Sequence, residues 1–175
     1  MKKIFLLLSI VSVFGLTSCS NDDNVDYVDY DTYPEVFDTN PVTFSPNNGR
    51  YEVIVPLNPN ILSSDVVTVY RRTVDNGTTV WEPIPTTLYI PNVNNPNVDL
   101  EVDYKFNFTT TDVLLYMQAT LDLATTPQYT QNQVFRIVLI PGYVAQNLDT
   151  NNYDAVMSAI KEANNGTPVQ IKTIK

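Results

Sequence analysis

Three carboxylates at alternate positions have the spacing best suited to chemistry in this sequence. In an extended strand, Asp99, Glu101 and Asp103 would point to one face about 6.6 Å apart, where they could cradle Ca²⁺. The same residues form the polar half of an alternating pattern, and no EF-hand-like spacing surrounds them. We therefore interpret them as a solvated strand face, with a Ca²⁺ site as the alternative.

The residue types that are missing argue against most catalytic sites. The 175 residues include no histidine and one cysteine. Histidine is the commonest general base and metal ligand, so Ser-His and Cys-His arrangements are excluded and zinc, copper and iron sites are disfavoured. No phosphate loop, GxSxG elbow or dinucleotide fingerprint occurs. We predict a protein that is not an enzyme and has no catalytic residue, cofactor or metal; a carboxylate-dependent glycan hydrolase is the alternative.

Aromatic residues are the other candidates for a binding role. The chain has eleven tyrosines, seven phenylalanines and one tryptophan, Trp81. Most aromatic side chains at strand positions belong to a core, but rings with a polar tip also suit contact surfaces for sugars or proteins. Trp81 follows the turn Asp75-Asn76-Gly77 and precedes Glu82-Pro83, so we single it out as a possible ligand contact. Burial under a loop is the alternative.

Strand patterns separated by Asn, Pro and Gly turns dominate the chain beyond residue 38. The clearest alternation places Val98, Leu100, Val102, Tyr104, Phe106 and Phe108 on one face. Further strands are predicted at 42–45, 50–57, 66–74, 78–84, 87–90, 113–121 and 134–140. Asp75-Asn76-Gly77 predicts a hairpin turn, because Asn and Gly tolerate positive φ. We expect a mainly β fold, an antiparallel β-sandwich of about 7–9 strands, as a single domain over residues 39–175.

Two local patterns modify this expectation. Apolar residues recur at three- and four-residue steps from Tyr153 to Ala163, which predicts one short C-terminal helix near 151–164, capped by Asn151 and closed by Gly166. We expect it to pack across an end or edge of the sandwich; a partner-binding helix is the alternative. Arg71 and Arg72 are adjacent in a strand and point to opposite faces, so at least one must reach an acid or the surface.

The first eighteen residues have the order of a secretory signal peptide. Met1-Lys2-Lys3 supplies positive charge, Ile4 to Leu16 is almost continuously apolar, and Thr17-Ser18 are small and polar. An apolar helix of about 13 residues rises about 20 Å, which is too short for a hydrocarbon core of about 30 Å. We predict residues 1–18 to be a signal peptide that is removed after export.

Leu16-Thr17-Ser18-Cys19 resembles the lipobox of bacterial lipoproteins. The resemblance implies that Cys19 is linked through a thioether to diacylglycerol, becomes the first residue after cleavage, and is then N-acylated with a fatty acid such as palmitate. Two or more acyl chains give stable anchoring where one would be marginal. An ordinary signal peptide with an incidental cysteine is the alternative.

Residues 19–38 are acidic and contain no basic residue, so we expect an extended tether. Ser20-Asn21-Asp22-Asp23 resembles the acidic export signal that follows the lipidated cysteine in surface lipoproteins of the Bacteroidetes. That resemblance implies a lipid-anchored protein at the cell surface, on the outer face of the outer membrane. A solvated linker without sorting information is the alternative.

The acidic lipoprotein start, the β-rich body and Val134-Phe135-Arg136-Ile137-Val138-Leu139-Ile140-Pro141-Gly142 followed by a helix resemble uncharacterised flavobacterial lipoproteins. The net charge of −9 argues against nucleic acid and anionic lipid headgroups as partners. We therefore expect a non-enzymatic binding or accessory module of the cell envelope. Its partners would be the membrane, through the lipid on Cys19, and an envelope protein or a glycan; the oligomeric state stays open. A periplasm-facing assembly partner of a membrane complex is a further alternative.

Overall fold

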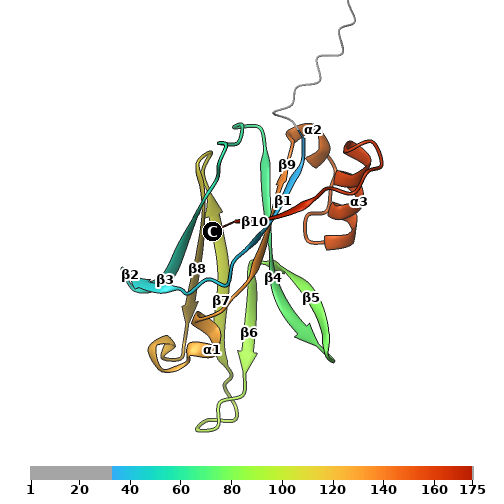
Figure 1. Cartoon of the computed structure of the whole chain (residues 1–175). Coiled ribbons are helices and arrows are strands. Elements are labelled where there is room, and N and C mark those ends of the chain that lie inside the picture. The colour runs from blue at the N-terminus through green and yellow to red at the C-terminus, as the bar shows by residue number, and fades with distance from the viewer. Residues whose placement is uncertain (1–32, 175) are drawn as a thin grey trace, which may run out of the picture.

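Two five-stranded sheets pack face to face in the computed structural model, which describes residues 33–174 (Figure 1). The expected signal peptide, Cys19 and residues 19–32 lie outside the described residues. The mainly β sandwich is confirmed. It has ten described strands rather than 7–9, and one of its sheets is mixed rather than antiparallel.

The mixed sheet is built around strand β9. Its order is β10 (Ile171–Ile174), β1 (Glu35–Thr39), β9 (Phe135–Ile140), β4 (Val66–Asp75) and β5 (Thr78–Ile84). Every residue of β9 is buried, because one face meets the other sheet and the other face meets a helix. The sheet is mixed because β10 runs parallel to β1, whereas the other pairs in this sheet are antiparallel.

The second sheet is antiparallel throughout. Its order is β2 (Ser45–Asn47), β3 (Arg50–Pro56), β8 (Asp112–Ala119), β7 (Leu100–Phe108) and β6 (Thr86–Ile90). The alternation predicted for β7 holds at its centre, where Val102 and Tyr104 are fully buried. It fails at the ends: Val98 precedes the strand and is 56% exposed, and Phe108 is 42% exposed. The apolar pattern is therefore longer than the core that it faces.

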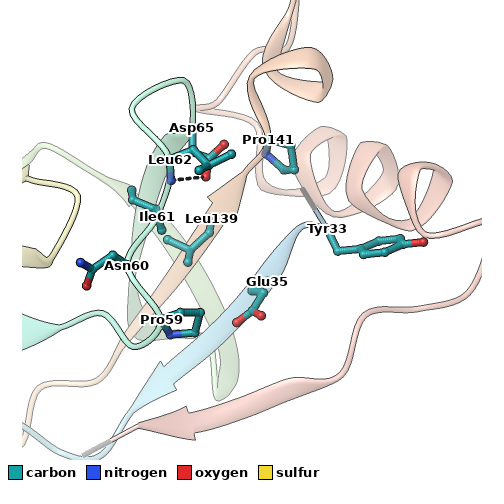
Figure 2. A pocket seen from close by; sticks show the side chains of 9 residues that line it. All are labelled: Tyr33, Glu35, Pro59, Asn60, Ile61, Leu62, Asp65, Leu139 and Pro141. Atoms are coloured by element: carbon teal, nitrogen blue, oxygen red, sulfur yellow. Dashed lines mark hydrogen bonds between the residues drawn. The ribbon is translucent and has the colours of Figure 1, made fainter. Parts of the chain in front are cut away.

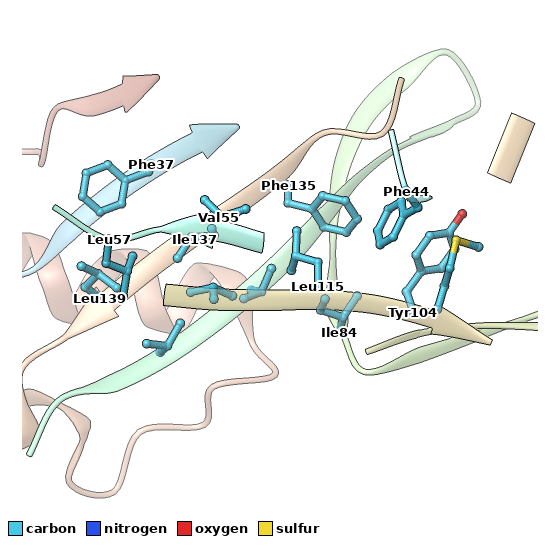
Figure 3. Close-up of a cluster of buried hydrophobic side chains, with 14 of the residues drawn as sticks. Phe37, Phe44, Val55, Leu57, Ile84, Tyr104, Leu115, Phe135, Ile137 and Leu139 are labelled. Atoms are coloured by element: carbon cyan, nitrogen blue, oxygen red, sulfur yellow. The ribbon is translucent and has the colours of Figure 1, made fainter. Parts of the chain in front are cut away.

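The inner faces of both sheets form one hydrophobic core (Figure 3). Phe135 and Ile137 of β9 meet Leu115 of β8 and Tyr104 of β7, and Phe44 packs edge-on against the rings of Tyr104 and Phe135. The interior is thus filled by side chains that alternate along each strand.

Turn residues connect the strands as their chemistry predicts. Asn76 and Gly77 both have positive φ, and Asp75 pairs with Thr78, which confirms the predicted hairpin between β4 and β5. At Pro85 the chain passes from the mixed sheet to the antiparallel sheet. Ile84 still pairs with β4 and Thr86 already pairs with β7, so residues 84–86 connect the two sheets directly.

Helix α3 (Tyr153–Ala163) confirms the helix expected near 151–164, with two corrections. The Asn152 side chain, not that of Asn151, caps it by accepting a hydrogen bond from the Ala155 amide. The helix covers the outer face of the mixed sheet rather than an end or edge, since Val156 and Ile160 are buried against that face (Figure 1).

Three further helical turns were not predicted because each is too short to show periodicity. They are the 3-10 helix η2 (Leu123–Thr125), α1 (Pro127–Thr130) and α2 (Gly142–Ala145). Within residues 33–174 no helix has the length and apolarity needed to span a membrane.

Strand β1 corrects the end of the expected tether. It begins at Glu35, so residues 35–38 belong to the sandwich and not to an extended linker. Val36 and Phe37 are buried on opposite faces of the sheet, and Asp38 pairs with Arg136. Glu35 and Asp38, two of the acidic residues assigned to the tether, therefore have partners within the fold, Lys172 and Arg136.

Candidate functional site

Trp81 lies on the outer face of the mixed sheet, on edge strand β5 and opposite Arg72 of β4. It is half-buried and lines an open groove, so it is not covered by a loop. The Arg136 guanidinium carbon lies 4.0 Å from the centre of the indole. The Tyr153 ring of α3 stacks at 6.5 Å between ring centres, with 22° between the ring planes. Trp81 is therefore held by side chains from two other elements.

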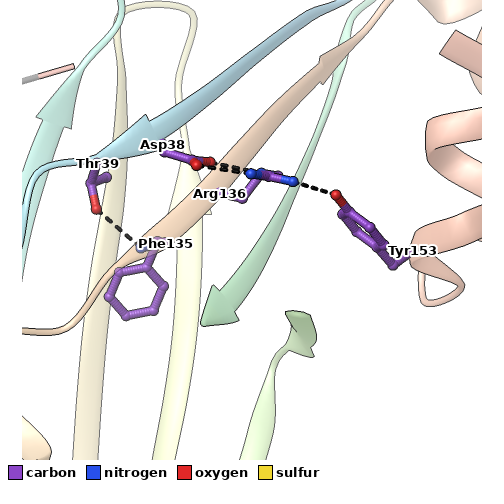
Figure 4. Close-up of polar contacts among 5 residues, drawn as sticks. All are labelled: Asp38, Thr39, Phe135, Arg136 and Tyr153. Carbon is purple, nitrogen blue, oxygen red and sulfur yellow. Dashed lines mark hydrogen bonds and ion pairs between the residues drawn. The ribbon is translucent and has the colours of Figure 1, made fainter. Parts of the chain in front are cut away.

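Arg136 connects strand β1 and helix α3 (Figure 4). It also contacts Trp81. Its Nε and Nη2 donate to the two carboxylate oxygens of Asp38 at 2.7 and 2.8 Å, and Nη1 donates to the Tyr153 hydroxyl. Burial opposes the charge of Arg136. The hydrogen bonds to Asp38 and Tyr153 outweigh that opposition, so the pKa of the guanidinium is raised above its ordinary value. A planar guanidinium can make this two-point bond while stacking on an indole.

Tyr70 fixes the segment that leads into α3. Its hydroxyl donates to the Thr150 carbonyl at 2.9 Å, and its ring meets the Tyr153 ring edge-on at 5.1 Å. Burial raises the pKa of Tyr70 above its ordinary value of 10.0. The wall of the groove is thereby tied to the sheet that forms its floor.

The groove has a cavity volume of about 590 Å³, within the range of small-molecule sites. Its lining consists of Thr79, Val80, Trp81, Asp149, Asn151, Asn152, Tyr153 and Asp154. The lining includes two carboxylates and two amides but no lysine or arginine. The Asp149 carboxylate accepts a hydrogen bond from the backbone N–H of Asn151. The side-chain oxygen of Asn152 accepts one from the backbone N–H of Ala155 and so caps α3. The side chains of Asn151 and Asp154 are exposed and make no hydrogen bond to the described part of the chain.

The three carboxylates considered as a Ca²⁺ site lie in different surroundings. Asp103 accepts hydrogen bonds from the Thr87 hydroxyl and from the Lys105 ammonium, each at 2.7 Å. The bonds from Lys105 and Thr87 lower the pKa of Asp103. Glu101 is exposed to solvent, and Asp99 lies just before β7. From residue 33 to residue 174, no three His, Cys, Asp or Glu side chains form a group able to hold a metal ion.

A second, smaller pocket of about 170 Å³ contains two further carboxylates, those of Glu35 and Asp65 (Figure 2). Glu35 pairs with the Lys172 ammonium at 3.2 Å, and Asp65 accepts from the Leu62 amide at 2.9 Å. Both carboxylates therefore hold parts of the fold together.

The two adjacent arginines of β4 separate as predicted. Arg72 is exposed on the outer face, whereas Arg71 points between the sheets. There its guanidinium lies 4.3 Å from the centre of the Tyr104 ring, donates to the Gln133 side chain and lies 3.7 Å from Glu82. This cluster stabilises one end of the core.

Comparison of the chain with protein-family models, with curated proteins and with solved structures finds no match. The assignment of the groove therefore depends on its residues alone. Of these, Trp81 was singled out from the sequence, whereas Arg136, Asp38 and Tyr153 were not. The available signal was a lone arginine inside the apolar run Val134 to Ile140, which requires a buried acid or an aromatic neighbour.

Proposed function

We propose that this chain is a lipid-anchored module of the bacterial outer membrane that binds a partner through the groove at Trp81 without catalysing a reaction. The lipobox at Leu16–Cys19 supports the anchor. The observation that carries the binding role is the fixation of Trp81 between Arg136 and Tyr153 beside an open cavity. A ring that is already immobilised loses little conformational entropy when a ligand packs on it.

The surroundings of the carboxylates favour binding over hydrolysis. A glycosidase needs one carboxyl group kept protonated by an apolar environment, close to a second that is ionised. Asp149 and Asp154 both line the groove, but both are exposed to water. Glu35 and Asp65 are bound to Lys172 and to the Leu62 amide. Neither pair has an environment that would divide the roles of acid and base.

Site-specific photo-crosslinking in intact cells tests this function. A benzophenone amino acid at position 79, exposed on the groove, should give a crosslinked product in the native envelope. The same probe at position 101, exposed on the other sheet, is the matched control and should not give that product. The Trp81→Ala change should abolish the product formed at position 79.

Two outcomes would overturn the proposal. Identical products from positions 79 and 101 would show that the groove has no special role. Turnover of a neutral oligosaccharide by the purified chain, lost on Asp149→Asn or Asp154→Asn, would establish the hydrolase instead.

A further inference from the structure

We infer that the groove at Trp81 binds an uncharged glycan, with a sugar ring on the indole and its hydroxyls on the amides and carboxylates that line the groove. This inference rests on the proposed binding function and adds the class of ligand. It follows from three properties of the lining: one fixed aromatic ring, several hydrogen-bonding groups in the same groove, and the distribution of charge.

The aromatic surface suits a sugar ring. A pyranose has a face of C–H groups that packs on an indole, while its hydroxyls project from the rim of the ring. Trp81 is only half-buried, and contacts with Arg136 at 4.0 Å and Tyr153 at 6.5 Å fix its ring. Aromatic residues supply large contact area with few rotatable bonds, so a fixed indole is an efficient sugar platform.

Polar side chains that line the groove can bind the hydroxyl groups of a sugar. Hydroxyls both donate and accept, so a site that recognises several of them needs acceptors and donors within a short distance. Asn151 offers an amide donor and an acceptor oxygen, and Asp154 offers acceptor oxygens. Neither side chain makes a hydrogen bond to residues 33–174. Both are therefore available at no cost in existing bonds.

Charge selects against anionic ligands. No lysine or arginine lines the groove, two carboxylates do, and the whole chain carries a net charge of −9. A uronic acid or a sulfated sugar would meet like charge at short range and lose its hydration.

The occupied cation–π position on Trp81 argues against a basic peptide. A lysine or arginine side chain would use Trp81 through a cation–π contact, but the Arg136 guanidinium already lies 4.0 Å from that ring. Arg72, which is paired with Trp81 in the register of β4 and β5, is exposed to solvent. A further cation would have to compete with Arg136 for the cation–π contact, whereas an uncharged sugar does not depend on that contact.

Trp81 is the only tryptophan of the chain, so its fluorescence reports on the groove directly. The mature chain, purified from membranes in detergent, would be titrated with hexasaccharides of glucose, xylose and mannose. Polygalacturonate and an oligolysine serve as the anionic and cationic probes. We expect a saturable shift of the emission to shorter wavelength, and protection from acrylamide quenching, with at least one neutral hexasaccharide only.

Substitutions locate the bound sugar without disturbing the fold. Asn151→Ala and Asp154→Ala should each weaken binding about tenfold, the effect of one lost hydrogen bond to a bound ligand. Tyr89→Ala, which removes a 66% exposed aromatic ring from the other sheet, is the matched control and should leave the affinity unchanged.

Three results would overturn the inference: a shift with oligolysine or polygalacturonate alone, no shift with any neutral hexasaccharide, or equal losses in the Tyr89→Ala and Asn151→Ala variants. None of these would remove a crosslink formed specifically at position 79 in cells. Failure of the glycan assignment is therefore distinguishable from failure of the binding function.

Discussion

Arg136 is the residue on which the geometry of the groove depends. Its side chain is only 9% exposed, and its charge is balanced by Asp38, which is 25% exposed. It meets the ring of Trp81 and the hydroxyl of Tyr153 at the same time. A charge in this position is tolerated only while its partners remain, because desolvating an unpaired ion is very costly.

Removing one member of this pair should destabilise the fold. Arg136→Met leaves the Asp38 carboxylate without its partner, so we expect the free energy of unfolding to fall by about 3–5 kcal/mol in urea denaturation. Lys172→Met is the matched control, because it removes the exposed ion pair with Glu35 on the same sheet and should cost less than about 1 kcal/mol. Equal losses in the two variants would contradict the role of Arg136.

Tyr104 provides a pH-dependent test of the core. Burial raises the pKa of its hydroxyl to about 12, against an ordinary value of 10.0. The folded protein therefore holds this proton more tightly than the unfolded chain. The difference in pKa therefore stabilises the folded state fully below pH 10, and this stabilisation is lost as the pH rises toward 12.

We expect ionisation of Tyr104 to lower the free energy of unfolding by about 2 to 3 kcal/mol between pH 10 and pH 12. The measurement is urea denaturation at a series of alkaline pH values. Tyr104→Phe should flatten this dependence, whereas Tyr89→Phe, at an exposed position, should not. A wild-type dependence retained in Tyr104→Phe would show that another group is responsible.

Helix α3 holds the groove wall against the sheet. Val156 and Ile160 are fully buried, and they contact Val36 of β1 and Val138 of β9 in one cluster. The helix begins immediately after Asn151 and Asn152, which line the groove. The position of the groove wall therefore depends on the docking of the helix.

Truncating the buried side of α3 should loosen this wall. Ile160→Ala should lower the free energy of unfolding by about 2–5 kcal/mol and weaken any ligand bound at Trp81. Ser158→Ala, on the exposed face of the same helix, is the control and should change stability by less than about 0.5 kcal/mol. An unchanged unfolding midpoint for Ile160→Ala would show that α3 does not stabilise the domain.

The sequence predicts those elements whose pattern is long enough to carry a period. The alternation in β7 and β8 and the Asp75-Asn76-Gly77 turn identify strands and a hairpin because each position has a clear inside or outside. Strands β1 and β10 escape prediction because four or five residues with charges among them resemble a linker. Only their pairing with each other and with β9 makes them strands.

The site was predictable to a smaller extent. Trp81 stands out by type, since it is the only tryptophan and follows a hairpin turn. Its neighbours Arg136 and Tyr153 come from β9 and α3. Asp38, which holds Arg136, comes from β1 and lies 98 residues before Arg136 in the sequence. No local pattern joins Asp38 to Arg136; the register of β1 against β9 does.

The proposed protein has a lipid on Cys19 and a sandwich domain that presents the groove at Trp81. If the acidic segment after Cys19 directs the protein outward, protease added to intact cells should degrade it. A periplasmic protein of known location is the control and should survive until lysis. Full protection of this chain in intact cells, with degradation only after lysis, would place it on the periplasmic side.

We propose that the thiol of Cys19 carries the lipid that anchors the sandwich to a membrane. Mass spectrometry of the protein isolated from its native cells tests this most directly. We predict an N-terminal peptide that begins at Cys19 and carries a diacylglyceryl thioether and an amide-linked acyl chain. A peptide with an unmodified cysteine, or one that still contains residues 1–18, would rule out the proposed lipid anchor at Cys19.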